Sequence, residues 1–342
     1  MTANQIAVSS VIWAIMARMK AMTVNELGPP EVLRLQSYPD PVPEADQIHV
    51  RIHAIGLNFP EFLQIAGKYQ HKPELPFVPG LEAAGDVIGI GPDVARYAIG
   101  DKVVIHGKTG MYADQAVVSE NAAIQLPTPF SYAEGAAFWA AYNTAYVCLV
   151  ARGRLAAGDR VLIHGAAGGV GLAAVDVAHQ IGAEVTAIVG SEDKAAAARA
   201  LGADHVINHR DPGSAMEIRT IAGDTGFNLA YDPVGGEAFQ QCLDHMAIGG
   251  RLLIVGFAGG TIPSTTLSAL RARRCAITGV RAGEYGRQDP AAGKAALDAL
   301  LEMAEAGKLR PQIYRSMPLA DAAAGLRLLD SRQVIGKVVL NP

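Results

Sequence analysis

Apolar positions in the first part of the chain come in short runs that are separated by proline and glycine. Runs of this kind, rich in β-branched and alternating residues, are typical of strands bounded by turns. The cluster at 39–43 is a loop, because a residue that precedes proline is disfavoured in a helix. The predicted strands are 20–25, 33–37, 47–56, 83–90, 101–105 and 111–118. We therefore expect an irregular, mostly antiparallel β domain with one short helix at 58–66.

From residue 131 onward the pattern changes to apolar strands that alternate with helical stretches. The alanine-rich segment 131–150 predicts one or two helices. The strands expected after it are 161–163, one ending near 189, 205–208, 229–232, 251–256 and 276–280, with helices at 193–201, 212–221 and 237–246 between them. Such alternation predicts a doubly wound parallel sheet with its ligand crevice at the carboxyl ends of the strands.

The last stretch of the chain returns to a mixed pattern. It contains an amphipathic helix at 291–306, a strand at 311–315, a helix at 319–329 and a closing strand at 334–340. We expect this tail to rejoin the first domain.

The stretch 160–189 holds the clearest functional motif, because a glycine-rich turn lies there between an apolar strand and a helix. The turn Ala166-Ala167-Gly168-Gly169-Val170-Gly171 is the dinucleotide fingerprint G-x-G-x-x-G with alanine at the first glycine position. Small residues allow a tight turn, close approach of a pyrophosphate and close packing of helix on strand, and the helix N-terminus offers free N–H groups to phosphates. We predict a dinucleotide site; the alternative is a structural glycine turn in another α/β sheet.

Composition narrows the possible functions. A length of 342 residues indicates two domains, and 50% hydrophobic with 18% charged residues is typical of a well-packed globular protein. A net charge of −4 with interspersed signs gives no basic face for nucleic acid or an anionic membrane. The cysteines at 148, 242 and 275 are far apart, so we expect no disulfide framework or zinc lobe, which suits a reducing cytoplasm.

The N-terminal residues need a separate interpretation. The apolar segment 6–16 is too short to span a bilayer and lacks the basic region and cleavage site of a secretory signal. The sequence from Met19 has the character of the start of a folded domain. We expect residues 1–18 to be an extension outside the fold.

Several motifs together resemble one family. They are the glycine-rich turn, the Asn-Phe-x-Glu turn at Asn58, LPFVPGLEAAG at 75–85, Asn-Thr-Ala-Tyr at 143–146 and VIGKVVL at 334–340. The chain from Met19 to its end resembles the zinc-free quinone oxidoreductases of the medium-chain dehydrogenase/reductase superfamily, the branch that includes zeta-crystallin. The resemblance implies an α/β protein with a GroES-like β-rich catalytic domain (19–142), a Rossmann NADP-binding domain (143–282) and a return to the catalytic domain (283–342). It also implies a homodimer.

The same resemblance bears on a metal. Where zinc-dependent alcohol dehydrogenases of the superfamily place a cysteine ligand, this chain has Asn58, and where they carry Gly-His-Glu it has Gly-Leu-Glu at 80–82. Leucine cannot coordinate a metal, and an amide is a poor substitute for a thiolate. We expect no metal, and we interpret Glu82 as a hydrogen-bonded structural acid. We interpret His53 and His106 as ordinary strand or loop residues.

The choice of nicotinamide cofactor depends on the end of the second Rossmann strand. NAD enzymes carry an Asp or Glu there for the ribose 2′-hydroxyl, whereas this chain has Val-Gly-Ser at 189–191. Gly190 leaves room for a 2′-phosphate, with which Lys194, three residues after Ser191, could pair. The resemblance places His209 beside the adenosine phosphate. We expect NADPH, although the nearby Glu192 keeps NAD possible, and Lys194 and the loop at 209–211 could simply be solvated.

The resemblance also assigns the reacting end of the cleft. It implies that Asn58 and Tyr69 line the nicotinamide side, where an amide hydrogen bond could stabilise a developing oxyanion and Tyr69 could contact cofactor or substrate. Thr144 would orient the carboxamide. The residues that follow the last two Rossmann strands would line the nicotinamide ring: Val255, Gly256, Phe257, Ala258, Val280, Arg281 and Ala282. Alternatively, Asn58 is an asparagine that only forms a turn, and Tyr69 is an amphipathic residue at the rim of the cleft.

We therefore expect NADPH-dependent, metal-free hydride transfer to a small-molecule quinone or other conjugated carbonyl, with no nucleic-acid or membrane partner. One alternative is reduction of enoyl thioesters or other α,β-unsaturated carbonyls, since the same cleft geometry would serve. A preference for CoA thioesters would need a basic patch for the phosphoadenosine, and Arg271, Arg273 and Arg274 form a basic cluster whose place relative to the cleft the sequence does not give. Another is an NADPH-binding protein with a structural or sensing role and no turnover.

Overall fold

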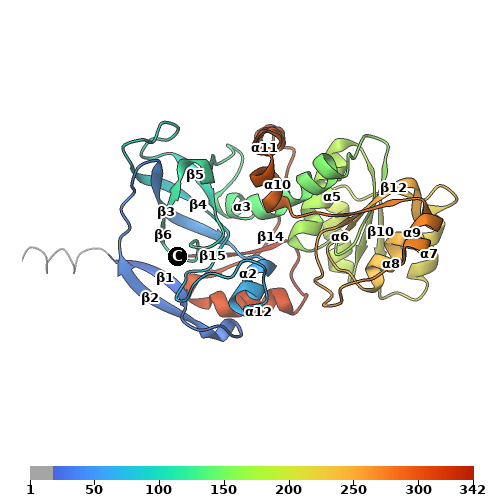
Figure 1. Ribbon diagram of the computed structural model, residues 1–342, viewed down its shortest axis with the longest axis horizontal. Coiled ribbons are helices and arrows are strands. Elements are labelled where there is room, and N and C mark those ends of the chain that lie inside the picture. Colours follow the sequence, from blue (N-terminus) through green and yellow to red (C-terminus); the bar gives the residue numbers. More distant parts are fainter. Residues whose placement is uncertain (1–17) are drawn as a thin grey trace, which may run out of the picture. The chain divides into compact units, whose positions relative to one another are not determined.

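The computed structural model describes residues 18–342, and these fall into two compact units (Figure 1). Unit 1 contains the residues up to Trp139 together with Ile313–Pro342, and unit 2 contains Ala140–Gln312. The expected N-terminal extension lies outside the described residues except for Arg18, which belongs to the first strand rather than to the extension.

Unit 1 is built on a seven-stranded sheet in the order β14-β15-β3-β4-β5-β7, with β6 also paired to β3. All its pairs are antiparallel except β14 with β15, which confirms the predicted mostly antiparallel domain. A separate hairpin joins β1 to β2. The strands are β1 Arg18–Val24, β2 Leu33–Pro39, β3 Gln47–Gly56, β4 Glu82–Ile90, β5 Lys102–His106, β6 Gln115–Ser119, β7 Ala123–Gln125, β14 Ile313–Pro318 and β15 Lys337–Asn341.

Three short α-helices accompany this sheet: α2 Phe59–Ile65, α3 Tyr132–Ala136 and α12 Ala322–Asp330. Single 3-10 turns lie at η1 Pro30–Val32, η2 Glu120–Ala122 and η5 Leu319–Asp321. The C-terminal strand β15 pairs with β3, so the red end of the chain lies beside this blue strand in Figure 1. The tail from Ile313 therefore rejoins the first domain.

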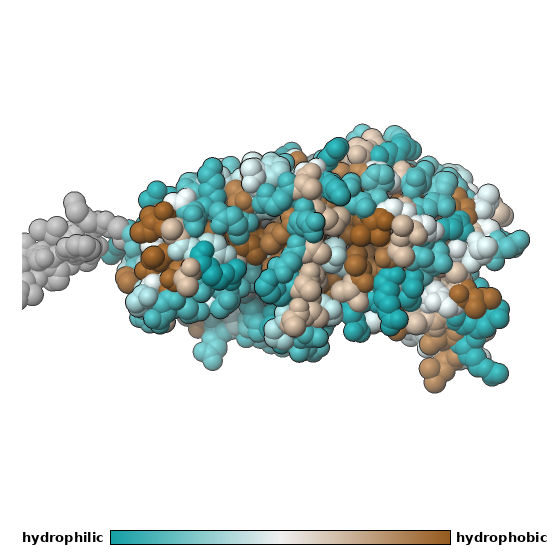
Figure 2. Space-filling view, turned by 90° about the horizontal axis from the view of Figure 1, so that it is seen from above, coloured by the Kyte–Doolittle hydropathy of each residue, from teal (hydrophilic) through white to brown (hydrophobic). Residues whose placement is uncertain are grey.

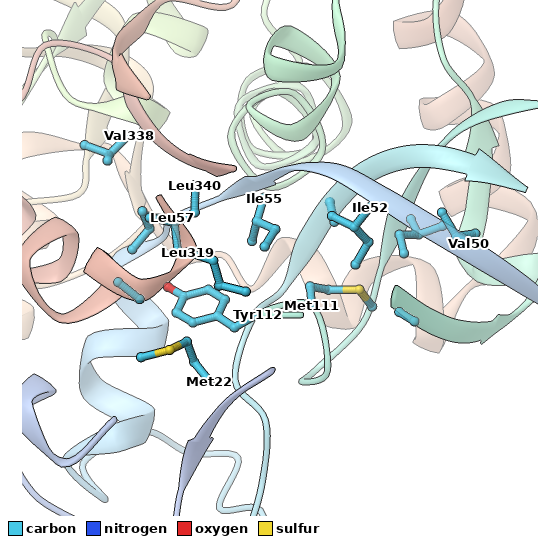
Figure 3. Packing of buried hydrophobic residues seen from close by; sticks show 14 of the residues in the cluster. Met22, Val50, Ile52, Ile55, Leu57, Met111, Tyr112, Leu319, Val338 and Leu340 are labelled. Atoms are coloured by element: carbon cyan, nitrogen blue, oxygen red, sulfur yellow. The ribbon is translucent and has the colours of Figure 1, made fainter. Parts of the chain in front are cut away.

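The core of unit 1 joins residues that are far apart in the sequence (Figure 3). Tyr112 is fully buried among aliphatic side chains such as Met22, Leu57 and Leu319. Each large apolar side chain buried in this way contributes about 1.5–3 kcal/mol to folding. This packing fixes the end of β3, which the candidate catalytic residue Asn58 follows.

Unit 2 is a six-stranded parallel sheet in the order β10-β9-β8-β11-β12-β13, as the alternating pattern predicts. The strands are β8 Arg160–Ile163, β9 Glu184–Val189, β10 His205–Asn208, β11 Phe227–Asp232, β12 Met246–Ile254 and β13 Ala276–Gly279. Its longer helices are α5 Gly169–Ile181, α6 Glu192–Ala200, α7 Ser214–Ala222, α8 Glu237–Asp244 and α11 Pro290–Glu305. The strand order reverses at β8 and β11, which places the expected ligand crevice at their carboxyl ends.

Some elements differ from the sequence prediction. The stretch 131–150 is α3, then a π-helix at η3 Trp139–Asn143, one turn of α-helix at α4 Thr144–Tyr146 and a second π-helix at η4 Val147–Arg152. The helices α9 Leu267–Arg273 and α10 Ala282–Gln288 were not predicted, because both are short and lack a sustained apolar face.

The expected domain boundary after residue 282 is also displaced. Residues 283–312 belong to unit 2 and not to the returning tail. One reason is a buried carboxylate: Asp176 in α5 accepts hydrogen bonds from Tyr142 Oη at 2.7 Å and from the Arg310 N–H at 2.8 Å. This contact holds the end of the segment on the Rossmann sheet until the chain leaves for β14.

The surface seen in Figure 2 is mainly hydrophilic, and its hydrophobic residues form separate groups. Among the described helices, none combines the length and the apolar character needed to cross a bilayer.

Candidate functional site

The glycine-rich turn of unit 2 connects β8 to α5. Gly165, at the start of the turn, has φ +58°, a conformation that glycine adopts without strain. A Cβ at Gly171 would lie 2.1 Å from the Gly165 carbonyl oxygen, so only glycine lets the helix pack on the turn. Ala166 is fully buried, and its N–H donates to Ile188 O at 3.1 Å. The tight turn therefore depends on Gly165, which the fingerprint analysis did not single out, and alanine at 166 is tolerated.

The start of α5 is open where a pyrophosphate would bind. Gly168 precedes the helix without a side-chain cap, and a Cβ there would contact only the Gly165 carbonyl oxygen, at 3.5 Å. The N–H groups of Gly169 and Val170 belong to the first helical turn, whose amides lack intrahelical acceptors. An anion is stabilised by such donors and by the helix dipole. Gly168, Gly169, Val170 and Gly171, with the buried Ala166 and Ala167, thus fit a dinucleotide phosphate.

A second corner lies at the ends of β9 and β10. A Cβ at Gly190 would lie 3.0 Å from His209 Nε2 and 3.6 Å from Arg210 Nε, so the two basic side chains converge on a position without a side chain. Burial lowers the pKa of His209, and the nearby cations Arg210 and Lys194 lower it further, whereas Glu237 opposes them. Gly190, Lys194 and His209 are therefore close neighbours, as the sequence predicted, with Arg210 added.

The residues after Gly190 begin the helix α6. Ser191 Oγ accepts a long hydrogen bond from the Lys194 N–H at 3.4 Å and caps the helix. The carboxylate of Glu192, which had kept NAD open as a cofactor, instead bonds to Arg199 at 2.6 Å on the surface. This corner therefore offers the cations Lys194 and Arg210, whereas the Glu192 carboxylate is already paired.

Two loops at the ends of β11 and β12 are joined through Asp232. The fully buried Asp232 Oδ1 accepts from the N–H groups of Val234 and Gly235 at 2.8 and 2.9 Å. The Ala258 N–H then donates to Pro233 O at 3.0 Å, so the loop that follows β12 is held against this turn. The predicted wall residues Val255, Gly256, Phe257 and Ala258 all lie in that loop, and Phe257 is 40% exposed.

The other predicted wall residues lie just after β13. Val280 is buried and its N–H donates to Ile254 O at 2.9 Å, whereas Ala282 is buried at the start of α10. Arg281 is exposed and pairs with Glu284 at 3.3 Å. Val280, Arg281 and Tyr285 line a hollow of about 230 Å³ on unit 2. Thr144 begins the helix α4 and is half-buried.

In unit 1, Asn58 belongs to a buried hydrogen-bond network. Its Nδ2 donates to Gly56 O at 3.1 Å and to Glu82 Oε1 at 3.0 Å, and its Oδ1 accepts from Lys337 Nζ at 2.5 Å. Lys337 also donates to Glu82 Oε1 at 2.7 Å and to Leu57 O at 2.8 Å. The amide orientation of Asn58 is thereby fixed, with its oxygen toward the cation and its nitrogen toward the carboxylate.

Glu61 connects the Asn58 turn to the segment before β4. This fully buried carboxylate accepts from the N–H groups of Asn58 and Leu81, both at 2.8 Å, and from Tyr112 Oη at 2.6 Å. Burial raises the pKa of Glu61 to about 7, although Tyr112, the backbone donors and Lys337 all favour the ionised form. The carboxyl group thus holds together the two positions at which zinc-dependent relatives carry ligands.

These residues do not fit a catalytic zinc ion. The Lys337 ammonium lies between Asn58 Oδ1 and Glu82 Oε1, the two oxygens that could ligate a cation. A divalent metal there would meet a fixed positive charge and would have no thiolate or imidazole ligand. Among residues 18–342 no group of three or more His, Cys, Asp and Glu side chains has the geometry of a metal site.

Tyr69 lies just after the turn that ends α2, where Gly67 has φ +70°. It is half-buried, and none of the hydrogen bonds between the described side chains involves its hydroxyl. Tyr69 and Asn58 therefore differ: the tyrosine hydroxyl is available, whereas the amide protons of the asparagine are already donated within unit 1.

Sequence reasoning missed several residues of these sites. Lys337, Glu61 and Asp232 carry the networks described above, and His164 lies fully buried just before the glycine-rich turn. A lysine inside the apolar run 334–340 and a histidine at the end of an apolar strand were the available signals. Neither signal identifies the residues that these side chains contact, because the contacts come from distant segments of the chain.

The comparisons with known proteins agree with this geometry. A model of the alcohol dehydrogenase GroES-like domain matches residues 44–128, and a model of the zinc-binding dehydrogenase family matches residues 169–302. The chain is 34% identical over 325 residues to the quinone oxidoreductase-like protein 2 homolog of Nematostella vectensis, covering 94% of this chain and 88% of the relative. It is 32% identical to human quinone oxidoreductase, covering 94% and 97% of the two chains.

A solved structure extends the comparison to three dimensions. The Escherichia coli quinone oxidoreductase, crystallised in complex with NADPH, matches with a TM-score of 0.86 at 28% identity and covers 94% of this chain and 100% of its own. The two-unit fold, the glycine-rich turn and these relatives lead to one conclusion: the chain belongs to the quinone oxidoreductase branch of the medium-chain dehydrogenase/reductase superfamily.

Proposed function

We propose that this protein is an NADPH-dependent oxidoreductase that transfers hydride to a quinone or another conjugated carbonyl without a metal. The observation that carries the proposal is the corner at Gly190, where His209 and Arg210 converge beside an open dinucleotide turn. This corner suits a 2′-phosphate, because the cations Lys194 and Arg210 lie near His209 and the Glu192 carboxylate is paired with Arg199. The NADPH complex of the Escherichia coli relative supports the same cofactor.

NADPH fits the donors that unit 2 presents, and it supplies the hydride when bound. The amides at the start of α5 hold the pyrophosphate, and Lys194, His209 and Arg210 hold the 2′-phosphate. Thr144 and the loops after β12 and β13 are proposed to orient the nicotinamide end and to exclude water from it. Reaction rate then depends mainly on positioning, for which oriented reactants are worth several kcal/mol.

Two residues of unit 1 are proposed to serve the acceptor. Its oxygen gains negative charge as hydride arrives, so a neutral hydrogen-bond donor is sufficient. We propose the Tyr69 hydroxyl as the first such donor. Asn58 can contribute only by redirecting an amide proton that it gives to Gly56 O or to Glu82 Oε1 within unit 1.

The structure gives less support to an enoyl-thioester substrate. Of the basic cluster, Arg273 is committed to Asp244, with bonds of 2.8 Å to its carbonyl oxygen and 2.5 Å to its carboxylate. Fewer cations therefore remain for a phosphoadenosine. Thioesters and other α,β-unsaturated carbonyls stay the second candidate, and NADPH binding without turnover is the alternative of another class.

We also propose a homodimer and a reducing cytoplasmic location. β13 ends the strand order of the unit 2 sheet, and an edge strand can pair with a second copy. Cys148 and Cys242 are buried free thiols whose pKa burial raises, which makes both inert to disulfide exchange. Sedimentation analysis of the purified protein tests the dimer.

The function is tested by following NADPH oxidation with benzoquinone, phenanthrenequinone and crotonyl-CoA as acceptors. Faster oxidation with the quinones than with the thioester is the expected result. Preference for crotonyl-CoA would replace the first candidate by the second. NADPH binding measured by calorimetry, with no consumption by any acceptor, would favour the binding-only alternative.

A further inference from the structure

Two aromatic rings in unit 1 form a parallel stack that the proposed reaction has not used. The imidazole of His106, the last residue of β5, and the indole of Trp139 have ring centroids 3.9 Å apart and an interplanar angle of 6°. Both side chains are half-buried. The prediction that His106 is an ordinary strand residue therefore leaves its flat contact with Trp139 unexplained.

The strand register places this stack beside the Asn58 network. Gly56, Glu82 and His106 are partners in one row across β3, β4 and β5. A Cβ on Gly56 would lie 2.6 Å from Glu82 Oε1, and Glu82 accepts from the Asn58 amide, so the row leads from the stack to the candidate catalytic turn.

The helix α3 places Trp139 beside this row of residues. A Cβ on Gly56 would lie 2.0 Å from the Ala136 carbonyl oxygen, so the end of α3 packs directly on the end of β3. The residues from Gly135 to Phe138 are buried, whereas Trp139, the next residue, is half-exposed. A π-helix begins at Trp139, and π-helical turns are rare and frequent at functional sites.

A second pair of rings shows what a structural contact looks like here. The rings of His53 and Tyr132 are tilted by 41°, and both side chains are bound to the Asp86 carboxylate. Hydrogen bonds to a common acid explain that pair. The His106 and Trp139 rings are parallel, and the flat indole is half-exposed next to a hydrogen-bonded polar row.

We propose that Trp139, supported by His106, is the stacking platform for the acceptor and selects planar conjugated rings over short aliphatic enones. The inference rests on the proposed function and names its substrate class. An electron-rich indole stacks well on an electron-poor quinone ring, and offset stacking adds to the burial of flat surface. A short aliphatic enone has no ring to stack and gains little from the platform.

Binding can be tested without turnover, because the chain has two tryptophans and the other is Trp13. In a Trp13→Phe background, the fluorescence of Trp139 is titrated with phenanthrenequinone in the absence of cofactor. Saturable quenching with an unchanged lifetime is expected, since a stacked complex does not emit. Linear quenching with a proportional fall in lifetime, as free acrylamide gives, would overturn the platform.

Selectivity is tested by kinetics of full-length variants. Trp139→Leu should raise the KM for phenanthrenequinone about tenfold, the value of one good stacking contact, and leave the KM for a short enone unchanged. Trp139→Phe, which keeps a flat ring, should recover most of this loss, and His106→Leu provides a second variant if Trp139→Leu does not fold. An equal KM increase for both acceptors in the folded variants would overturn the selectivity.

The two proposals can fail separately. Saturable quenching without NADPH consumption would keep the platform as a site for planar rings and refute the reductase function. NADPH consumption with linear quenching would keep the function and refute the platform.

Discussion

Lys337 and Glu82 form a buried ion pair at 2.7 Å, although 255 residues separate them in the chain. The lysine side chain is 6% exposed and the glutamate fully buried. The pair ties the first residue of β15 to the first residue of β4, and Asn58 bridges both partners through its amide. One ion pair therefore fixes the turn that carries a candidate catalytic residue.

Lys337→Met should lower the free energy of unfolding by about 3–5 kcal/mol, because it leaves a carboxylate buried without its partner. Urea denaturation of the folded protein measures this change. Lys294→Met is the matched control, since its ion pair with Asp298 is mostly exposed and such pairs contribute about 1 kcal/mol or less. A double variant, Lys337→Met with Glu82→Gln, should recover part of the loss. Equal, small effects in Lys337→Met and Lys294→Met would contradict the role of the pair.

The dinucleotide turn could be predicted from sequence because its chemistry is local. Strand, turn and helix are consecutive, and the small residues at 166–171 act through their own backbone. The two-unit fold could be predicted for a similar reason, because the pattern changes from short strands to alternating strands and helices once along the sequence, near residue 131. Local periodicity carries both signals.

The networks around Asn58 could not be predicted in this way. Asn58 has its partners at residues 56, 82 and 337, and no spacing rule connects these positions. The π-helical turns after α3 were likewise hidden, because an alanine-rich segment predicts an ordinary helix. Packing against distant strands decides both features.

The pKa of Glu61 predicts how stability changes with pH. Burial raises this pKa from its usual 4.5 to about 7, so the folded state binds the proton more tightly than the unfolded state. The resulting stability is complete below pH 4.5 and is lost as the pH rises to about 7, a change of about 3 kcal/mol. In Glu61→Gln this loss should be absent. The measurement is the difference in unfolding free energy between wild type and variant at several pH values.

Glu134→Gln is the control for that experiment. Glu134 forms the same kind of capping box with Ser131 that Glu61 forms with Asn58, but it lies nearer the surface. Its difference from wild type shows what the loss of a capping box alone does to stability. A difference between Glu61→Gln and wild type that stays constant with pH would mean that the buried carboxyl does not titrate in this range.

His164 should impose a pH dependence of the opposite sign. It is fully buried, and burial, with a further contribution from His209, lowers its pKa from 6.5 to about 3. The folded state therefore favours neutral imidazole, and the stability present above pH 6.5 is lost as the pH falls, by about 2 kcal/mol at pH 5. His164→Leu should remove this loss, whereas His179→Leu at an exposed position should not. Thermal unfolding at pH 7 and pH 5 compares them.

Cofactor choice should depend on the corner at Gly190. Lys194→Ala should raise the KM for NADPH about tenfold and leave the KM for NADH nearly unchanged, because only NADPH carries the 2′-phosphate with which Lys194 would make a charge-assisted contact. Gly190→Asp should reverse the preference, since it places a carboxylate beside His209 where NAD enzymes bind the ribose hydroxyl. Lys308→Ala, on the exposed surface of unit 2, is the control. Steady-state kinetics with both cofactors measure these changes. Equal effects of Lys194→Ala on the KM for NADPH and for NADH would show that this corner does not bind the 2′-phosphate.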